Sequence, residues 1–404
     1  LEDDSFKNYV VYDLEISRLV ANATEDMGLS SKVIERTKNF FGLGLLYWMY
    51  GRPMDPTKSW LEKKFKNKPE LVEANLRALN AGYNFGDITE SVATKYEVGA
   101  APLKKGTYRN IVGNYATGLG LLAASQLSKL PLFFGGYPIT PASDILHQLS
   151  HYKNYGVKTF QAEDEISGIG SVIGAAFTGS LGVTATSGPG IALKTEAIGL
   201  GVISELPMVI INVQRGGPST GLPTKTEQAD LLMAMHGRNG ESPIPVIAAS
   251  TPGDCFYVAY EACRIAIKYM TPVFILSDGF IANGSEPWML PDLDKLKEIK
   301  INEPQSRDGQ FLAYERDEKT LARSWAIPGL KGFEHRVGGI EKEHITGNVN
   351  YDPDNHDLMV KLRAQKVSSI VNEIPKTEIY GNKTGEILIL GWGSTFGAIR
   401  SGVE

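Results

Sequence analysis

Short apolar segments alternate with helical segments through the middle of this 404-residue chain, beginning near Asn110. The strand-like segments, rich in Val, Ile and Phe, are 130–134, 157–161, 182–186, 207–213, 244–248 and 272–277. The helical segments between them are 141–153, 165–179, 190–204, 226–235 and 252–269. Parallel strands joined by helical crossovers produce this pattern. The sequence therefore predicts an α/β fold with a doubly wound parallel sheet.

Polar or glycine-rich turns follow the first four strand-like segments. In chain order these turns contain YPITPAS, AEDEISGIG, SGPG and RGGPSTGLPT. In an open parallel sheet the carboxyl ends of the strands share one edge, and ligands bind in the crevice there. We therefore expect one site to collect side chains from all four turns. Its predicted members are Tyr137, Thr140, Glu165, Ser187 and Arg215.

The spacing of apolar residues and the local composition predict how the rest of the chain divides into domains and linkers. Apolar residues at helical spacing predict a small helical unit at the start, and polar residues with scattered Gly, Pro and Lys predict a linker after it. A long connector rich in Pro and charged residues follows the α/β domain. The predicted divisions are the helical unit at 1–85, the linker at 86–109, the α/β domain at 110–290, the connector at 291–380 and a further segment at 381–404.

The last of these segments contains EILILGW, residues 386–392, which predicts a strand leading into a helix. A strand followed by a helix is the opening of a second α/β domain. The chain also begins with Leu1 and not with Met. Both ends therefore indicate a fragment of a longer protein.

The charge and hydropathy patterns argue against several classes of function. A formal net charge of −5 and an isoelectric point near 5.8 do not favour binding to nucleic acid or to an anionic membrane. No apolar run approaches the roughly 20 residues that span a bilayer. The opening residues LEDDSFKNYV lack the basic region and the apolar core of a signal peptide. We therefore expect a cytoplasmic protein.

The two cysteines of the chain, Cys255 and Cys263, fall in one predicted helix. Their spacing suits neither a disulfide between them nor an iron–sulfur cluster. The sequence therefore predicts two reduced thiols in the core and places any metal cluster on another chain. The six histidines show no metal-ligand spacing, and we assign no metal ligand to this chain.

The turn at residues 137–143 is stiffened by two prolines. Pro138 and Pro141 fix their own φ angles and push the residues before them toward extended geometry. Pro141 suits the first position of the following helix, which would make Thr140 the N-cap. Thr140 then has two open interpretations. It either caps the helix and does nothing more, or it presents a hydroxyl and amides to a substrate carboxylate.

Glu165 begins a helix that carries several small residues after it. These residues, Ser167, Gly168, Gly170, Gly174 and Ala175, would let another helix or subunit approach closely. An acid ahead of such an apolar face is expected to be partly buried, and a buried carboxyl can share a proton with a ring nitrogen. The alternative is that the acidic run 163–165 only stabilises the helix N-terminus.

The remaining two turns also allow a functional and a structural interpretation. The glycine-rich turn that starts at Ser187 could bring backbone amides close to a ligand, although such a turn often only reverses the chain. Arg215, at the carboxyl end of a predicted strand, could hold a carboxylate with both arms of its guanidinium. A surface salt bridge is the alternative for Arg215.

Taken in order, these motifs resemble the 2-oxoacid:ferredoxin oxidoreductases, specifically the α subunit of a 2-oxoglutarate-type enzyme with a fused γ segment. The resemblance rests on YPITPAS, AEDEISGIG, SGPG, VQRGGPSTGLPTKTEQADL and GFEHRVGG…TGNVNYDPDNHDLMVKLRAQK, and it covers nearly the whole chain. Residues 1–85 resemble the C-terminal part of the γ domain. Residues 110–290 resemble the pyrimidine-side domain that binds thiamine diphosphate, and residues 381–404 resemble the start of the second α domain.

The resemblance implies a role for each predicted site residue. The glutamate matching Glu165 hydrogen-bonds N1′ of the cofactor's aminopyrimidine, which helps to remove the C2 proton of the thiazolium. The residues matching Thr140 and Arg215 hold the 1-carboxylate of the oxoacid. The remaining assignments are Tyr137 and Ile139 on the substrate side, and Pro138, Ser187 and Gly188 on the cofactor side.

The resemblance also implies a reaction and a partner. The reaction is oxidative decarboxylation of 2-oxoglutarate with coenzyme A to succinyl-CoA, CO2 and reduced ferredoxin. A β subunit would bind the cofactor's diphosphate through Mg2+, carry a [4Fe-4S] cluster and pass electrons to ferredoxin, in an (αβ)2 assembly.

Three alternatives stay open at this point. The same chemistry could act on pyruvate, branched-chain oxoacids or arylpyruvates, or the chain could be a non-catalytic scaffold subunit. Lys225 is a candidate partner for the distal carboxylate of 2-oxoglutarate, and an ordinary surface lysine is the competing interpretation.

Overall fold

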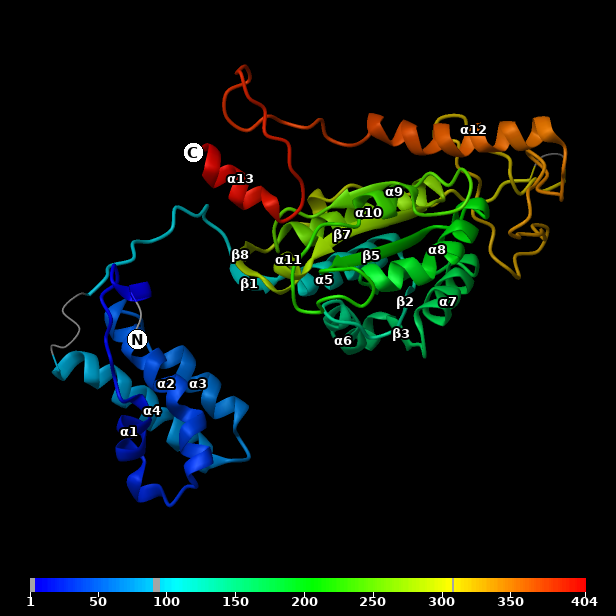
Figure 1. Ribbon diagram of the computed structural model, residues 1–404. Helices are drawn as coiled ribbons and strands as arrows, with labels where there is room; N and C mark the ends of the chain where they lie inside the picture. The colour runs from blue at the N-terminus through cyan, green and yellow to red at the C-terminus, as the bar shows by residue number, and fades with distance from the viewer. Residues whose placement is uncertain (1–3, 90–94, 307–308) are drawn as a thin grey trace. The chain divides into compact units, whose positions relative to one another are not determined.

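The computed structural model describes residues 4–89, 95–306 and 309–404, which form two compact units (Figure 1). The first unit is Leu1–Lys105 and the second is Gly106–Glu404. The first unit is helical. Its helices are α1 (Ile16–Ala23), α2 (Ser31–Met49), α3 (Asp55–Lys64) and α4 (Pro69–Ile88), with short 3-10 turns at Asp4–Phe6 and Glu25–Met27.

Helices α2 and α4 approach so closely that only glycine fits at their contact. A Cβ atom on Gly82 would lie 1.9 Å from the carbonyl oxygen of Phe41, and one on Gly44 would lie 2.0 Å from that of Leu79. Val20, Phe41 and Ala78 are buried beside this contact. A compact core therefore exists inside the small helical unit.

The second unit contains a six-stranded parallel sheet, which confirms the predicted doubly wound α/β fold. The strands lie in the order β3-β2-β4-β5-β7-β6, and every neighbouring pair is parallel. Their bounds are β2 Leu132–Gly136, β3 Lys158–Gln161, β4 Leu181–Thr186, β5 Met208–Gln214, β6 Val246–Ala248 and β7 Pro272–Asp278. Each begins within two residues of its predicted start.

Helices cover both faces of this sheet (Figure 1). One face packs against α5 (Gly113–Ser128), α6 (Ser143–Leu149) and α10 (Asp254–Tyr269), and the other against α7 (Glu165–Phe177), α8 (Gly188–Ile203) and α9 (Leu231–His236). Alternate residues of β5 serve the two cores, with Val209 and Ile211 on the first face and Ile210 on the second. Burial on both faces explains why the strand sequences are continuously apolar.

Several elements depart from the sequence analysis. Helix α5 and the antiparallel pair β1 (Tyr108–Val112) and β8 (Ser285–Met289) were not predicted. Helix α4 extends to Ile88 and β1 starts at Tyr108, so the polar segment between them is shorter than the predicted linker. The remaining elements of this unit are the 3-10 turns Ser150–Tyr155, Leu293–Lys295 and Ile370–Asn372 and the helices α11 (Gly279–Asn283), α12 (Pro353–Ser369) and α13 (Thr395–Val403).

The strand predicted at 386–392 is wrong. No strand forms there, and Ile387 and Leu390 are 85% and 88% exposed. A strand is held by ladder hydrogen bonds to a neighbour, and no strand of the described residues pairs with this segment. The helix predicted to follow does form, as α13.

Two other expectations can be compared with the structure. Cys255 and Cys263 are buried free thiols, as predicted, and burial raises the pKa of Cys255 to about 12. Among the described residues, no helix is both long and apolar enough to cross a membrane.

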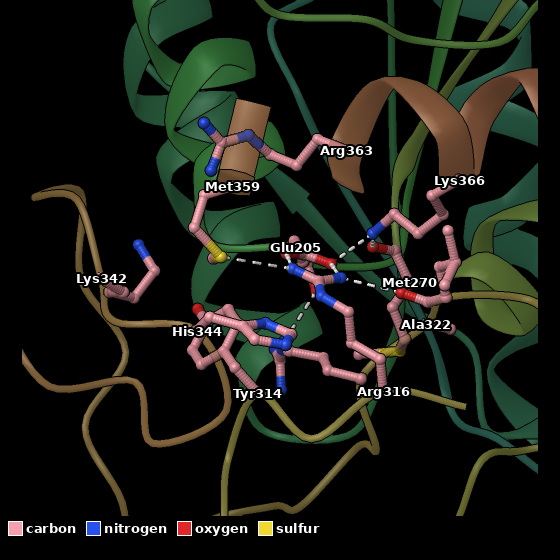
Figure 2. A network of polar contacts seen from close by, with 12 residues as sticks. Glu205, Met270, Tyr314, Arg316, Ala322, Lys342, His344, Met359, Arg363 and Lys366 are labelled. Atoms are coloured by element: carbon pink, nitrogen blue, oxygen red, sulfur yellow. Dashed lines mark hydrogen bonds and ion pairs between the residues drawn. The ribbon is translucent and has the colours of Figure 1, made fainter. Parts of the chain in front are cut away.

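A buried carboxylate, Glu205, in the loop between α8 and β5, is one of the groups that hold the connector to the sheet domain. Figure 2 shows Glu205 between Arg316 of the connector and Lys366 of α12. Arg316 donates to both carboxylate oxygens, at 2.8 Å and 2.5 Å, and Lys366 forms an ion pair with one of them. Arg323 adds hydrogen bonds to the carbonyl oxygens of Ser204 and Glu205, at 3.3 Å and 3.2 Å.

The burial of Glu205 affects the pKa of its carboxyl group. Burial by itself disfavours the charged carboxylate, but Lys366 and Arg316 outweigh it and hold the pKa of Glu205 well below its usual range. Burial lowers the pKa of Lys366 to about 8, although Glu205 acts in the opposite direction. Glu205 is therefore ionised at neutral pH and is the counter-charge that Arg316 and Lys366 require.

We expect Glu205→Gln to destabilise the protein by about 3–5 kcal/mol, because it leaves Arg316 and Lys366 buried without their counter-charge. The measurement is the free energy of unfolding from urea titration of the full-length protein. The matched control is Asp357→Asn, which removes the exposed ion pair with Lys361 and should change stability by less than about 1 kcal/mol. Equal effects of the two variants would contradict the assignment.

Candidate active site

The order of the strands reverses between β2 and β4, and a ligand-binding crevice is expected there. From β2 the chain moves outward to β3, and it then returns to the other side of β2 as β4. Such a reversal is where ligands bind in open α/β sheets. The loop after β2 carries Tyr137, Ile139 and Thr140, and β4 is followed directly by Ser187 and Gly188. The topology therefore places two of the predicted turns on the two sides of this crevice.

The loop after β2 forms a separate turn before its helix. The amides of Ala142 and Ser143 donate to the carbonyl oxygen of Ile139 at 2.8 Å and 3.1 Å, and α6 begins only at Ser143. The Thr140–Pro141 peptide is cis. The prediction that Thr140 is the N-cap of the helix is therefore wrong, because this turn occupies the position where the cap was expected. Thr140 is exposed beside the crevice.

Arg215 connects this loop with the loop after β5. Its Nη1 donates to the carbonyl oxygen of Thr140 at 2.6 Å, and its Nη2 donates to that of Thr220 at 2.7 Å. The side chain is only 7% exposed, and its Nε has no partner among the described residues. The surface salt bridge considered for Arg215 is therefore wrong. One N–H of the guanidinium remains available at a buried position.

Glu165 is the first residue of α7 and is 8% exposed. The cap of this helix is Asp164, whose side chain accepts from the amide of Ser167 at 2.7 Å. Asp164, and not Glu165, therefore caps α7. The carbonyl oxygen of Glu165 accepts a hydrogen bond at 2.8 Å from Nζ of Lys194, which is completely buried in α8.

Unpaired hydroxyls lie next to Glu165. A Cβ atom on Gly190 would lie 1.9 Å from Oγ1 of Thr186 and 3.0 Å from Cγ of Glu165, so the end of β4, the start of α8 and Glu165 are in close contact. The hydroxyls of Thr186 and Ser187 are buried and have no partner in the described part of the chain. Buried polar groups are normally paired, so these hydroxyls are suited to a ligand.

An acid and an amide lie on the other side of the same helix start. Nδ2 of Asn212 donates to Oδ2 of Asp230 at 2.9 Å, and a Cβ atom on Gly188 would lie 2.8 Å from that oxygen. Burial raises the pKa of Asp230. The described ranges contain no group of three or more His, Cys, Asp or Glu residues that could hold a metal ion.

Two cavities of the second unit lie away from Glu165 and Arg215. A cavity of about 270 Å3 lies at the carboxyl-terminal part of α8, and its lining includes Leu200 and Arg363. A second cavity, of about 540 Å3, lies beside Trp392. Neither is lined by Glu165 or Arg215.

Several known proteins are similar to this chain in sequence and in fold. The family model described as pyruvate flavodoxin/ferredoxin oxidoreductase, thiamine diphosphate-binding, matches residues 126–350, which is more than half of the chain. The 2-oxoglutarate synthase subunit KorA of Archaeoglobus fulgidus is 34% identical over 67% of this chain and 70% of its own length. This chain belongs to the 2-oxoacid:ferredoxin oxidoreductase family.

Two further relatives extend the match within this oxidoreductase family. The 2-oxoglutarate oxidoreductase subunit KorA of Mycobacterium tuberculosis is 54% identical over 99% of this chain and 61% of its own length. The 2-oxoglutarate:ferredoxin oxidoreductase of Magnetococcus marinus, solved with 2-oxoglutarate, coenzyme A and succinyl-CoA bound, superposes with a TM-score of 0.80 at 34% identity. That match covers 95% of this chain and 65% of the solved chain, so this chain spans a little under two thirds of both relatives. The resemblance stated from the motifs is confirmed.

Within this oxidoreductase chain, the structure connects the predicted residues in two groups. Thr140 and Arg215 are in direct contact, and Glu165 lies beside the strand end that carries Ser187. Lys194 was missed by the sequence analysis. A single lysine inside the otherwise small and apolar start of α8, GPGIALK, was the available signal.

Gly190→Ala should displace Glu165 and Thr186, because the added methyl group has no space between them. Overpacking of this kind costs about 1–3 kcal/mol, and we expect roughly a tenfold or larger loss of any turnover that depends on Glu165. The control is Gly199→Ala on the same helix, where the nearest atom to a new Cβ would be 3.9 Å away. Turnover that is unchanged in Gly190→Ala would show that this contact does not position Glu165.

Proposed function

We propose that this chain is the α-subunit part, with a γ segment, of an enzyme that oxidatively decarboxylates 2-oxoglutarate. Coenzyme A would accept the succinyl group, CO2 would leave, and the pair of electrons would pass singly to ferredoxin. The observation that carries the proposal is the buried Glu165 beside the unpaired hydroxyls of Thr186 and Ser187, within the family's thiamine diphosphate-binding domain.

The residues around Glu165 fit the aminopyrimidine half of thiamine diphosphate. The cofactor, when bound, supplies a nucleophilic carbon and an acceptor for the electrons of the cleaved bond. The Glu165 carboxyl would hold and exchange a proton at the pyrimidine N1′ atom. Ser187 and Gly188 would line the cofactor from the start of α8, and Pro138 would line it from the loop after β2. The unpaired hydroxyl of Ser187 would gain the partner that it lacks within the described chain.

The loop after β5 fits a substrate with two carboxylates. The free Nε–H of Arg215 would donate to the 1-carboxylate, with Thr140 beside it and with Tyr137 and Ile139 along the same wall. The amide of Gly216 donates to the carbonyl oxygen of Lys225 at 2.8 Å, which holds Lys225 next to the residue that follows Arg215. Lys225 is exposed and could therefore reach the distal carboxylate of 2-oxoglutarate.

We further propose that a partner subunit completes the site. It would hold the diphosphate through Mg2+, carry a [4Fe-4S] cluster and contact ferredoxin in a cytoplasmic (αβ)2 assembly. The names of relatives as subunits support a partner, as does the lack of a suitable ligand cluster among the described residues. The domain assignment belongs to the same proposal, with a γ segment at 1–85, a linker at 86–109, the cofactor domain at 110–290, a connector at 291–380 and the start of a second α domain at 381–404.

Glu165→Gln in the assembled complex should lower turnover of 2-oxoglutarate by roughly 100-fold to 10,000-fold, because the amide cannot exchange the proton. Reduction of a redox dye would be measured with 2-oxoglutarate, pyruvate, a branched-chain oxoacid and an arylpyruvate. The control is Glu163→Gln in the same acidic run, which should retain activity. Full activity in Glu165→Gln would overturn the catalytic role and favour a scaffold subunit, and a preference for another oxoacid would replace 2-oxoglutarate as the substrate.

Arg215→Ala should raise the KM for the oxoacid roughly tenfold to 100-fold, because hydrogen bonds to charged groups contribute about 1.5–3 kcal/mol. The KM for coenzyme A should not change, and this second constant serves as the internal control. An unchanged KM for all oxoacids would reject Arg215 as the carboxylate ligand.

A further inference from the structure

We propose that Lys194 is a positioning residue, which anchors the first residue of α7 and supplies a buried positive charge beside the Glu165 carboxyl. This inference rests on the proposed function, because it concerns the proton held by Glu165. It adds a residue that the motif sequence did not indicate and that touches neither the substrate nor the cofactor in the proposal.

The first part of the inference is a mechanical contact. Nζ of Lys194 lies 2.8 Å from the carbonyl oxygen of Glu165, and the lysine side chain is completely buried. This bond joins the first turn of α7 to the second turn of α8. A Cβ atom on Gly190, one helical turn earlier on α8, would lie 3.0 Å from Cγ of Glu165, so the backbone of α8 lies close to this side chain. Helix α8 therefore approaches both the backbone and the side chain of Glu165.

The second part is electrostatic. Burial lowers the pKa of Lys194 to about 8, and the carboxylates of Glu165 and Asp164 act in the opposite direction. The packed strands β4 and β5 carry no charged side chain, and Asp278 of β7 is occupied in capping α11. Glu196, on α8 itself, is two residues away and so faces another direction.

Placing a positive charge next to a buried carboxyl has a definite effect. Burial alone favours the neutral acid and so raises a carboxyl pKa, whereas a nearby ammonium favours the carboxylate and lowers it. Lys194 is the positively charged side chain that lies in this position beside Glu165.

The test uses Lys194→Met, which removes both charge and donor, and Lys194→Gln, which retains a donor without the charge. In the full complex, the acidic limb of the pH profile of kcat/KM should move to higher pH by roughly one unit in both variants. In the full-length apo protein, hydrogen exchange of the amides of Ser167 to Ile169 should become roughly tenfold faster in Lys194→Met and change less in Lys194→Gln.

Lys366→Met is the matched control. Lys366 is the other completely buried lysine with a pKa lowered to about 8, and its partners are Glu205 and the carbonyl oxygen of Met270. This variant should lose stability while keeping the wild-type pH profile. If Lys194→Met behaves in the same way, Lys194 is only structural and the inference is overturned. If Lys194→Met does not fold, the pH profile of Lys194→Gln decides between the same outcomes.

The two proposals fail in different ways. If the wild-type complex neither binds thiamine diphosphate nor oxidises any oxoacid, the proposed function is wrong and the proton-tuning role is wrong with it. If the wild type is active and both Lys194 variants keep its pH profile, only the inference about Lys194 is wrong.

Discussion

Burial of the parallel sheet on both faces decides where this chain can carry chemistry. Strand β5 is buried from Met208 to Gln214, so a polar group that meets a ligand must lie beyond a strand end. The reversal of strand order between β2 and β4 then selects one part of that edge. Thr140 and Ser187 follow the two strands on either side of this reversal, and Glu165 and Arg215 follow the adjacent strands β3 and β5.

The amino-terminal and carboxyl-terminal edges of the sheet, where its strands begin and end, differ in how the buried polar groups named below are paired. At the amino-terminal edge, Glu205 has both carboxylate oxygens paired, by Arg316 and Lys366. At the carboxyl edge, the hydroxyl of Ser187 and the Nε of Arg215 are buried and unpaired within the described residues. Nε of Arg316 is also unpaired at the first edge among the described residues, so it is the pairing of the Glu205 carboxylate that identifies a structural attachment there. The unpaired groups at the second edge are where we expect a ligand or another chain.

Local patterns explain which features could be predicted from the sequence. The spacing of apolar residues predicted the strands and the helices on both faces of the sheet. The turns of the candidate site could be predicted because they directly follow the predicted strands. The strand predicted at 386–392 was wrong because its apolar sequence suits a strand, but a strand also needs a neighbouring strand to pair with. The local sequence does not show whether such a neighbour is present. Glu205 was missed because its partners lie 111 and 161 residues away. Thr140 was misassigned as a cap because Pro141 suits a helix start and the intervening backbone turn has no sequence signal.

The buried lysines Lys194 and Lys366 have their charges compensated in different ways. Lys194 and Lys366 are both fully buried, and burial lowers the pKa of each to about 8. Lys366 is paired directly with a carboxylate, whereas Lys194 donates a hydrogen bond to a carbonyl oxygen. A buried ammonium is costly without a counter-charge, and for Lys194 that charge comes from Glu165 and Asp164. Lys194 therefore joins α8 to the start of α7 both by a hydrogen bond and by charge, whereas Lys366 joins α12 to the loop before β5.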